Sequence, residues 1–220
     1  MNDIYTTEFT PNWKYQLKYE LCSYFGRMFY DKKPPVKSYL LHLGCGNTYL
    51  DNFVNADFFY LRWVPFIKQQ YTYDWLLDFR YPFKCPDNYW DGVFSEHTIE
   101  HLRYHDCLNL FKELYRTMKP GAWLRIAVPG LEESLNSYAA ADENDKKTKA
   151  EFIYNLTQNY GHVSVWDADL MIKVLNDAGF TIVMQAQYLQ GNDSRLLQDN
   201  LERRGNSLYM EAQKEIEESI

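Results

Sequence analysis

Short apolar segments separated by polar turns dominate the chain between residues 38 and 130. Each is short enough to be one buried β-strand, whereas residues 104–118 place apolar side chains at helical spacing and predict a helix. Lys119-Pro120-Gly121 is expected to end this helix, because proline and glycine both stop helical runs. Strands that alternate with a helix predict an α/β protein. The predicted strands are 40–43, 53–59, 75–78, 90–95 and 122–128.

The two ends of the chain carry the remaining predicted elements. Residues 12–30 form a tyrosine-rich amphipathic helix that either caps a ligand or simply docks on the domain, and residues 31–35 are a linker. Residues 132–158 are mostly helical with a break near 142–147. Another helix covers 167–178 and is capped by Asp167. Residues 180–184 are the sixth strand, and residues 206–212 are expected to close the sheet.

The first strand leads directly into Gly44-Cys45-Gly46. Two glycines one residue apart let the backbone turn sharply and approach a ligand that a Cβ atom would obstruct, although an ordinary turn can share this pattern. A dinucleotide fingerprint needs a third small residue, but Tyr49 stands at that position, and no Gly-Lys-Ser/Thr follows as in a phosphate loop. The pattern therefore favours a nucleoside cofactor without phosphates.

Two aspartates follow the next predicted strands. Asp57 ends the second strand, where a carboxylate can accept hydrogen bonds from both ribose hydroxyls. Asp78 ends the third strand, where it could accept a hydrogen bond from the exocyclic amine of an adenine. Either residue alone could be a solvated strand end or a helix cap. Their common position after a Gly-x-Gly turn favours cofactor binding.

An ordered set of motifs extends this pattern. It comprises Leu41-His42-Leu43-Gly44-Cys45-Gly46-Asn47, Asn55-Ala56-Asp57, Leu77-Asp78, Asp91-Gly92-Val93-Phe94-Ser95-Glu96-His97, Glu100-His101-Leu102 and Met118-Lys119-Pro120-Gly121. With this set the chain resembles the class I S-adenosylmethionine-dependent methyltransferases, of the small single-domain type found in glycan and secondary-metabolite clusters. One departure is that only about ten residues separate Gly44 from the second strand, so the first crossover helix is expected to be a single turn or missing.

The resemblance implies an α/β fold of the Rossmann-like, doubly wound type. Its seven-stranded sheet is mostly parallel, with one antiparallel strand near the C-terminus and helices on both faces. It also implies one methyltransferase domain over residues 1–220. Within it, 1–35 are the N-terminal cap helix and linker, 38–130 the cofactor-binding half, and 131–220 the acceptor-side helices and last strands.

The resemblance further implies S-adenosylmethionine as the cofactor and O-methylation of a small carbohydrate-like or phosphorylated acceptor. In-line transfer needs mainly alignment, but a hydroxyl acceptor also needs a base, for which histidine is best matched near neutral pH. His162 is the preferred base ahead of His97, while His101 is expected mainly to fix its loop by hydrogen bonds. The expected cofactor-binding residues are Gly44, Cys45, Gly46, Asn47, Asp57, Phe58, Asp78, Phe79, Ser95 and Glu96.

Residues 97–101 also invite two metal-site interpretations. They match H-x-x-E-H, the inverted zinc-peptidase motif, which is rejected because here it follows a buried strand instead of lying inside a long helix. Glu100 and His101 also resemble part of the E-x-x-E-H ion site of small-RNA terminal 2′-O-methyltransferases, but His97 replaces the leading acid. A divalent metal is therefore possible but not expected, and no metal ligand is predicted.

Composition and charge indicate which kinds of molecule the protein is expected to bind. A formal net charge of -7 and a pI near 5.3 disfavour nucleic acid, and four cysteines without a C-x-x-C motif suit a reducing cytosol. The N-terminus lacks a signal-peptide pattern and no apolar run is long enough to span a membrane, so a cytoplasmic protein acting on a small molecule is expected. Two other functions stay open, a non-catalytic cofactor-binding relative and a nicotinamide oxidoreductase, although Tyr49 argues against the latter.

Overall fold

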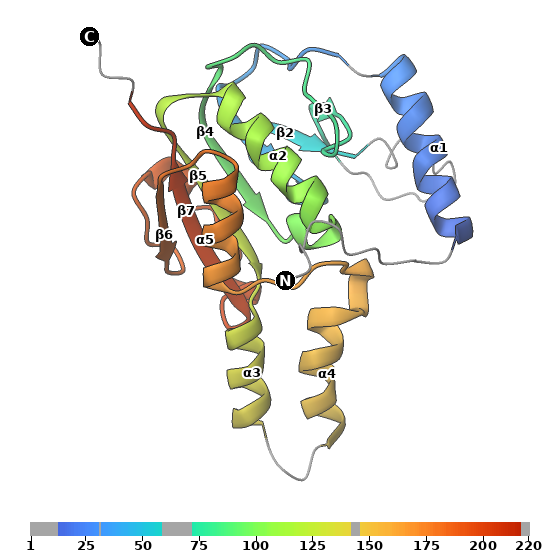
Figure 1. Cartoon of the computed structure of the whole chain (residues 1–220), viewed down its shortest axis with the longest axis vertical. Coiled ribbons are helices and arrows are strands. Elements are labelled where there is room, and N and C mark those ends of the chain that lie inside the picture. The colour runs from blue at the N-terminus through green and yellow to red at the C-terminus, as the bar shows by residue number, and fades with distance from the viewer. Residues whose placement is uncertain (1–12, 31, 59–71, 142–145, 217–220) are drawn as a thin grey trace.

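Seven strands form one mixed sheet in the computed structural model, which describes residues 13–30, 32–58, 72–141 and 146–216 (Figure 1). The strand order is β3-β2-β1-β4-β5-β7-β6. Strand β7 pairs antiparallel with β5 and β6, whereas the other pairs are parallel, which confirms the predicted fold class. The strands are β1 Leu40–Leu43, β2 Val54–Asp57, β3 Trp75–Leu76, β4 Trp90–Glu96, β5 Met118–Pro129, β6 Ile182–Ala186 and β7 Ser207–Gln213.

Helices α2 and α5 pack side by side on one face of the sheet, and α3 and α4 extend as a pair beyond its edge (Figure 1). Asp167 caps α5, as predicted, by accepting a hydrogen bond from Leu170 N at 2.8 Å. The α-helices are α1 Trp13–Phe29, α2 Tyr104–Thr117, α3 Leu131–Ala140, α4 Lys146–Thr157 and α5 Ala168–Asp177. The short 3-10 helices are η3 Ile99–His101, η4 Asn159–Gly161, η5 Ser194–Leu196 and η6 Leu201–Arg203.

The two faces of the sheet bury different apolar sets because side chains alternate along each strand. Val93 of β4 belongs to the large core that α2 and α5 cover. The next residue, Phe94, points to the opposite face, where it packs with Phe53 and with Leu196 of η5. The segment around η5 therefore covers the face that α2 and α5 leave free.

The crossover from β1 to β2 contains no helix, in agreement with the short spacing. Buried Asn55 holds this loop by donating to Leu50 O and accepting from Leu50 N, both at 2.9 Å. Its Oδ1 also lies 3.1 Å from Nδ1 of His42 on β1. The hydrogen bonds of this one amide side chain thus hold the connection between β1 and β2, which contains no helix.

Helix α2 ends at Thr117, which confirms the predicted helix over 104–118 to within one residue. Two strand boundaries and the place of the last strand were wrong. Strand β5 begins at Met118 and not at residue 122, so Lys119-Pro120-Gly121 lies inside it, because Met118 is buried and pairs with Trp90. The register shifts between Trp90 and Gly92, so Pro120 sits in an irregular part of the pairing, where sheets tolerate proline. Strand β6 lies two residues later than predicted. Strand β7 lies between β5 and β6 and therefore does not form the edge of the sheet.

Candidate functional site

The strand order reverses between β1 and β4. From β1 the chain moves outward through β2 and β3, and then returns to β4 on the other side of β1. Open α/β sheets bind ligands in the crevice outside the carboxyl ends of the strands at such a switch point. The Gly44–Asn47 loop begins there, and the backbone N–H groups of Gly44 and Cys45 donate to Ala56 O at 2.8 and 3.0 Å.

Gly44 and Gly46 have different structural roles. Both have positive φ angles, +74° and +50°, which glycine adopts readily. A Cβ atom on Gly44 would lie 2.0 Å from Thr98 Oγ1, so this glycine is needed for packing within the protein. A Cβ atom on Gly46 would meet nothing within 4 Å among the described residues. The open space that a close ligand approach needs therefore lies in front of Gly46, whereas Gly44 faces Thr98.

Asp57 fixes the glycine loop from the end of β2. Its carboxylate accepts hydrogen bonds from Gly46 N and Phe58 N, both at 2.6 Å, and burial raises its pKa. Cys45 is buried with its sulfur 3.8 Å from Asp57 Oδ2, and burial raises the thiol pKa. Asn47 is exposed on the loop. The structure thus brings Gly46, Asp57 and Phe58 together at the switch point.

Asp78 is surrounded by protein hydrogen-bond donors. It is 4% exposed, and its carboxylate accepts from Arg80 N, Nε and Nη2 at 2.8–3.0 Å and from Ser23 Oγ of α1 at 2.5 Å. Arg80 also pairs with Glu20 of α1. An adenine amine could bond to Asp78 only in place of one of these partners. Helix α1 is therefore docked against the segment that follows β3.

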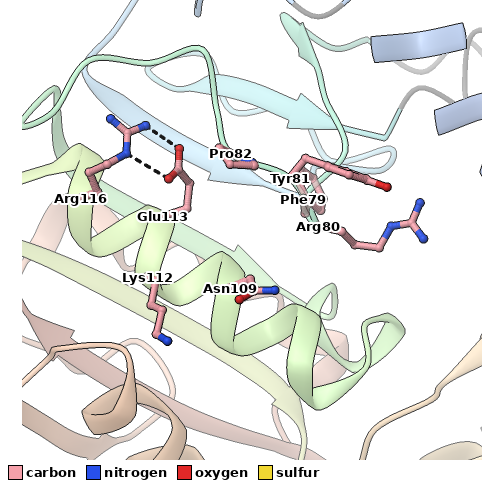
Figure 2. Close-up of a pocket in the computed structure, with 8 residues that line it drawn as sticks. All are labelled: Phe79, Arg80, Tyr81, Pro82, Asn109, Lys112, Glu113 and Arg116. Carbon is pink, nitrogen blue, oxygen red and sulfur yellow. Dashed lines mark hydrogen bonds and ion pairs between the residues drawn. The ribbon is translucent and has the colours of Figure 1, made fainter. Parts of the chain in front are cut away.

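Phe79 lies at a different hollow, between residues 79–82 and the outer side of α2. Figure 2 shows this hollow, which has a volume of about 410 Å³. Its carboxylate, Glu113, accepts hydrogen bonds from Arg116 Nε at 3.0 Å and from Phe83 N at 2.6 Å. None of the predicted catalytic histidines lines it. We therefore do not assign this hollow to the chemistry.

Ser95 and Glu96 point to opposite faces of β4. Ser95 is buried, and its Oγ has no hydrogen-bond partner among the described residues. Glu96 Oε1 accepts from Asn200 N at 2.8 Å, while Oε2 lies 3.6 Å from Arg203 Nη1. Burial raises the pKa of Glu96. Glu96 therefore holds the segment around η6, whereas the Ser95 hydroxyl remains able to bind a ligand.

The three predicted catalytic histidines meet around Glu100 in a cavity of about 480 Å³. His97 follows β4 with a φ of 50°, and His101 lies in η3. Glu100 O accepts from Val163 N at 2.9 Å, which brings the loop with His162 to the same place. Nδ1 of His97 and Nε2 of His162 each lie 3.7 Å from Glu100 Oε1, and Nε2 of His101 lies 3.9 Å from it.

Burial controls the charge of this cluster. It lowers the pKa of His97 to about 3 and also lowers the pKa values of His101 and His162. It raises the pKa of Glu100 to about 8. The imidazoles are therefore neutral at physiological pH and can accept a proton or donate an electron pair.

Two residues of the cavity were missed as site residues by sequence reasoning. Glu100 was mentioned only in the metal motifs, although its place between two histidines was a usable signal. Arg203 reaches the cavity from η6, about 100 residues from His101. It lies in a polar segment without any pattern, so nothing in the sequence indicated it.

Comparison with known proteins supports the predicted class. A family model described as a methyltransferase domain matches residues 13–185, so the chain belongs to this family. This membership confirms the resemblance to class I S-adenosylmethionine-dependent methyltransferases and S-adenosylmethionine as the cofactor of the class. No curated protein matched the chain in a sequence search. No helix among the described residues has the length and apolarity that a membrane span requires.

Solved structures share the fold at low sequence identity. A chain from the complex between the Haloferax volcanii Trm112 methyltransferase activator and the putative methyltransferase is 13% identical, with a TM-score of 0.51 over 94% of each chain. A possible exported protein from Bordetella parapertussis is 12% identical, with a TM-score of 0.50 over 91% of this chain and 68% of that one. A Thermotoga maritima methyltransferase described as a possible histamine N-methyltransferase is 14% identical, with a TM-score of 0.49 over 91% and 90%.

Proposed function

We propose that this protein transfers the methyl group of S-adenosylmethionine to an oxygen atom of a small polar acceptor bound in the histidine cavity. The observation that carries the proposal is the contact between this cavity and the glycine loop. Thr98 follows His97 directly, and its Oγ1 lies 3.3 Å from the carbonyl oxygens of Leu43 and Gly44. A methyl donor in the crevice and an acceptor in the cavity would therefore share one wall.

For the cofactor, we assign the loop around Gly46 and the carboxylate of Asp57. Gly46 leaves open space in front of the backbone, where a ligand can approach closely. The two oxygens of a carboxylate offer about four lone-pair sites; Gly46 N and the Cys45 thiol donate to Oδ2 of Asp57, and Phe58 N donates to Oδ1. The remaining site on Oδ1 can accept one ribose hydroxyl, and the second hydroxyl can replace the weak Cys45 thiol donor. Phe58 and Ser95 flank this position from the ends of β2 and β4.

The acceptor side supports a small hydroxyl-bearing substrate. The cavity volume of about 480 Å³ suits a small molecule, and polar side chains such as Asn155, Arg203 and Asn206 line it. Arg203 suits an anionic group such as a phosphate, so a carbohydrate-like or phosphorylated metabolite is the proposed acceptor class. His162 Nδ1 donates to Leu156 O at 3.2 Å, which leaves Nε2 able to take the hydroxyl proton.

Calorimetry with S-adenosylmethionine tests the cofactor assignment. Asp57→Ala should weaken binding by about 10- to 150-fold, because hydrogen bonds to a charged group contribute about 1.5–3 kcal/mol. Asp51→Ala is the matched control, since Asp51 is exposed on the same loop and should leave the affinity unchanged. Equal affinity in both variants would remove Asp57 from the ribose role.

Turnover with a panel of hydroxylated and phosphorylated metabolites tests the reaction. Formation of S-adenosylhomocysteine should depend on one acceptor class, and His162→Ala should lower turnover by about 10²–10⁴ with nearly unchanged cofactor affinity. Exposed His105 provides the control variant His105→Ala. Cofactor binding without product formation from any acceptor would instead identify a non-catalytic relative.

A further inference from the structure

Glu100 is a buried carboxylate without hydrogen-bond partners for its side chain. It is 1% exposed, and neither Oε1 nor Oε2 has a hydrogen-bond partner among the residues that the structure describes. A buried charge is costly unless it is paired or coordinates a metal ion. Nevertheless the carboxylate faces a polar cavity that also holds three imidazole rings. This arrangement calls for a group that can satisfy the carboxylate and the rings together.

The hydrogen bonds of His162 and His101 identify which ring nitrogen carries the proton. Nδ1 of His162 lies 3.2 Å from Leu156 O, and Nδ1 of His101 lies 3.4 Å from Gly161 O. A carbonyl oxygen can only accept, so both Nδ1 atoms are donors and each neutral ring keeps a lone pair on Nε2. These two lone pairs face Glu100 Oε1 at 3.9 and 3.7 Å, distances that are too long for hydrogen bonds.

His97 repeats the arrangement through its other nitrogen. Its Nε2 lies 2.8 Å from Ser207 Oγ, and that hydroxyl donates its single hydrogen to Arg203 O at 2.8 Å. His97 Nε2 must therefore be the donor, which leaves the Nδ1 lone pair 3.7 Å from Glu100 Oε1. The outer N–H of all three rings is thus bound to a protein acceptor, as is usual for histidines that ligate metals.

We propose that Glu100, His101 and His162 bind a divalent transition-metal cation, with His97 next to the carboxylate but outside this group of three. One ligand atom from each of the first three residues lies within 4.8 Å of the others. Two ligand atoms held about 2.0–2.2 Å from one tetrahedral ion are about 3.3–3.6 Å apart. The observed separations of 3.7–3.9 Å from Glu100 Oε1 are close to that value and too long for hydrogen bonds.

The donor set selects the class of cation. Imidazole nitrogen with one carboxylate suits Zn²⁺, Co²⁺, Fe²⁺ or Mn²⁺, whereas Mg²⁺ and Ca²⁺ prefer sites made of oxygen atoms. The sequence analysis predicts no metal ligand, because His97 stands where the related motif has an acid. In the structure His97 still presents a lone pair to the same carboxylate. The site is inferred from these contacts. A His162 Nε2 atom that ligates an ion cannot also take the hydroxyl proton, so an occupied site would replace His162 as the base of the proposed reaction and would leave the cofactor assignment unchanged.

Metal titration of the chelator-treated, tag-free protein tests the site without cofactor or acceptor. Co²⁺ binding, followed by visible absorption, and Zn²⁺ binding, followed by calorimetry, should both show one ion per chain, and Mg²⁺ should bind much more weakly. Glu100→Gln should weaken Co²⁺ and Zn²⁺ binding by at least about 100-fold, since the loss of an outer-shell partner alone costs about 10- to 100-fold.

Two variants serve as controls, each with a substitution of the same kind at a residue outside the cluster. Glu132→Gln and His105→Ala alter exposed residues and should bind the ions as tightly as the unmodified protein. His101→Ala should weaken binding like Glu100→Gln, and it replaces that variant if circular dichroism shows that Glu100→Gln is not folded.

Three outcomes would overturn the inference. No binding of Co²⁺ or Zn²⁺ by the unmodified protein would show that the cluster is not a metal site. Equal binding by folded Glu100→Gln or His101→Ala would place the ion elsewhere. Mg²⁺ binding as tight as that of Co²⁺ would refute the cation class. None of these results would bear on S-adenosylmethionine binding, and failure of the metal site would leave His162 as the proposed base.

Discussion

Arg125 and Glu100 are both buried ionisable side chains, but their surroundings differ. Arg125 of β5 is fully buried and donates to Asp199 at 2.5 and 2.8 Å and to Glu211 at 3.0 Å. It also donates to two carbonyl oxygens of the segment after β6. Glu100 is equally buried, yet its carboxylate has no hydrogen-bond partner in the described part of the chain.

The difference separates a buried group whose partners are part of the fold from one that we propose binds a metal ion. The Arg125 network joins β5, β7 and the segment after β6, and its donors and acceptors match within the protein. Glu100 lies 3.7–3.9 Å from three imidazole nitrogens and makes a hydrogen bond to none of them. A buried charge whose partners are all supplied by the fold stabilises the fold, whereas one without partners is suited to a ligand. Removing each charge should therefore have opposite consequences.

The largest expected effect is at Arg125. Arg125→Met should lower the free energy of unfolding by about 3–5 kcal/mol, because Asp199 and Glu211 would remain buried without a counter-charge. Urea denaturation of the folded chain measures this loss. Arg204→Met is the control, since Arg204 is exposed and lies 5.2 Å from the Tyr188 ring, a contact that contributes less than about 1 kcal/mol. Similar losses in both variants would contradict the structural role of the Arg125 network.

His42 provides an intermediate case, a buried ionisable group kept neutral. Burial lowers its pKa to about 4 from an ordinary value of 6.5. The unfolded chain therefore binds the proton more readily, so the stabilising contribution is complete above pH 6.5 and is lost as the pH falls towards 4. Relative to His42→Gln, the native protein should lose about 3 kcal/mol of stability between pH 7 and pH 4. A stability difference between the two proteins that does not change with pH would contradict this pKa shift.

The smallest expected effect is at Glu100. Without divalent cations at pH 7, Glu100→Gln should lower the free energy of unfolding by no more than about 1 kcal/mol and could raise it, because no hydrogen bond of the carboxylate is lost. The same urea denaturation measures it, with Glu132→Gln as the exposed control. A loss of about 3–5 kcal/mol would show that Glu100 has a structural partner like those of Arg125, and would end the contrast between the two residues.

Local patterns predicted the elements that form the sheet. Apolar runs identified β1 to β5, and the short spacing after Gly44 correctly excluded a full crossover helix. The end of helix α2 was predicted to within one residue, but the start of β5 was misplaced, because pairing of Met118 with Trp90 outweighs the local preference of proline and glycine. Local patterns carry no information about such pairings between distant segments.

The residues of the candidate site were likewise predictable only where they lie close together in the sequence. His97 and His101 could be placed together because they share one short segment after β4, whereas the contact of His162 with Glu100 depends on a loop about 60 residues away. The partners of Asp78 were not foreseeable, because Ser23 approaches it from α1 across 55 positions of sequence. Side chains that a residue meets through tertiary packing leave no local pattern.

The interior position of β7 constrains how the protein can fold during synthesis. Strand β6 pairs only with β7 in the described part of the sheet, although β7 leaves the ribosome later. Residues 182–186 therefore have no partner strand until residues 207–213 have been synthesised. Arg125 likewise meets Glu211 only then, so a ribosome paused before residue 207 should hold a nascent chain whose sheet ends at β5.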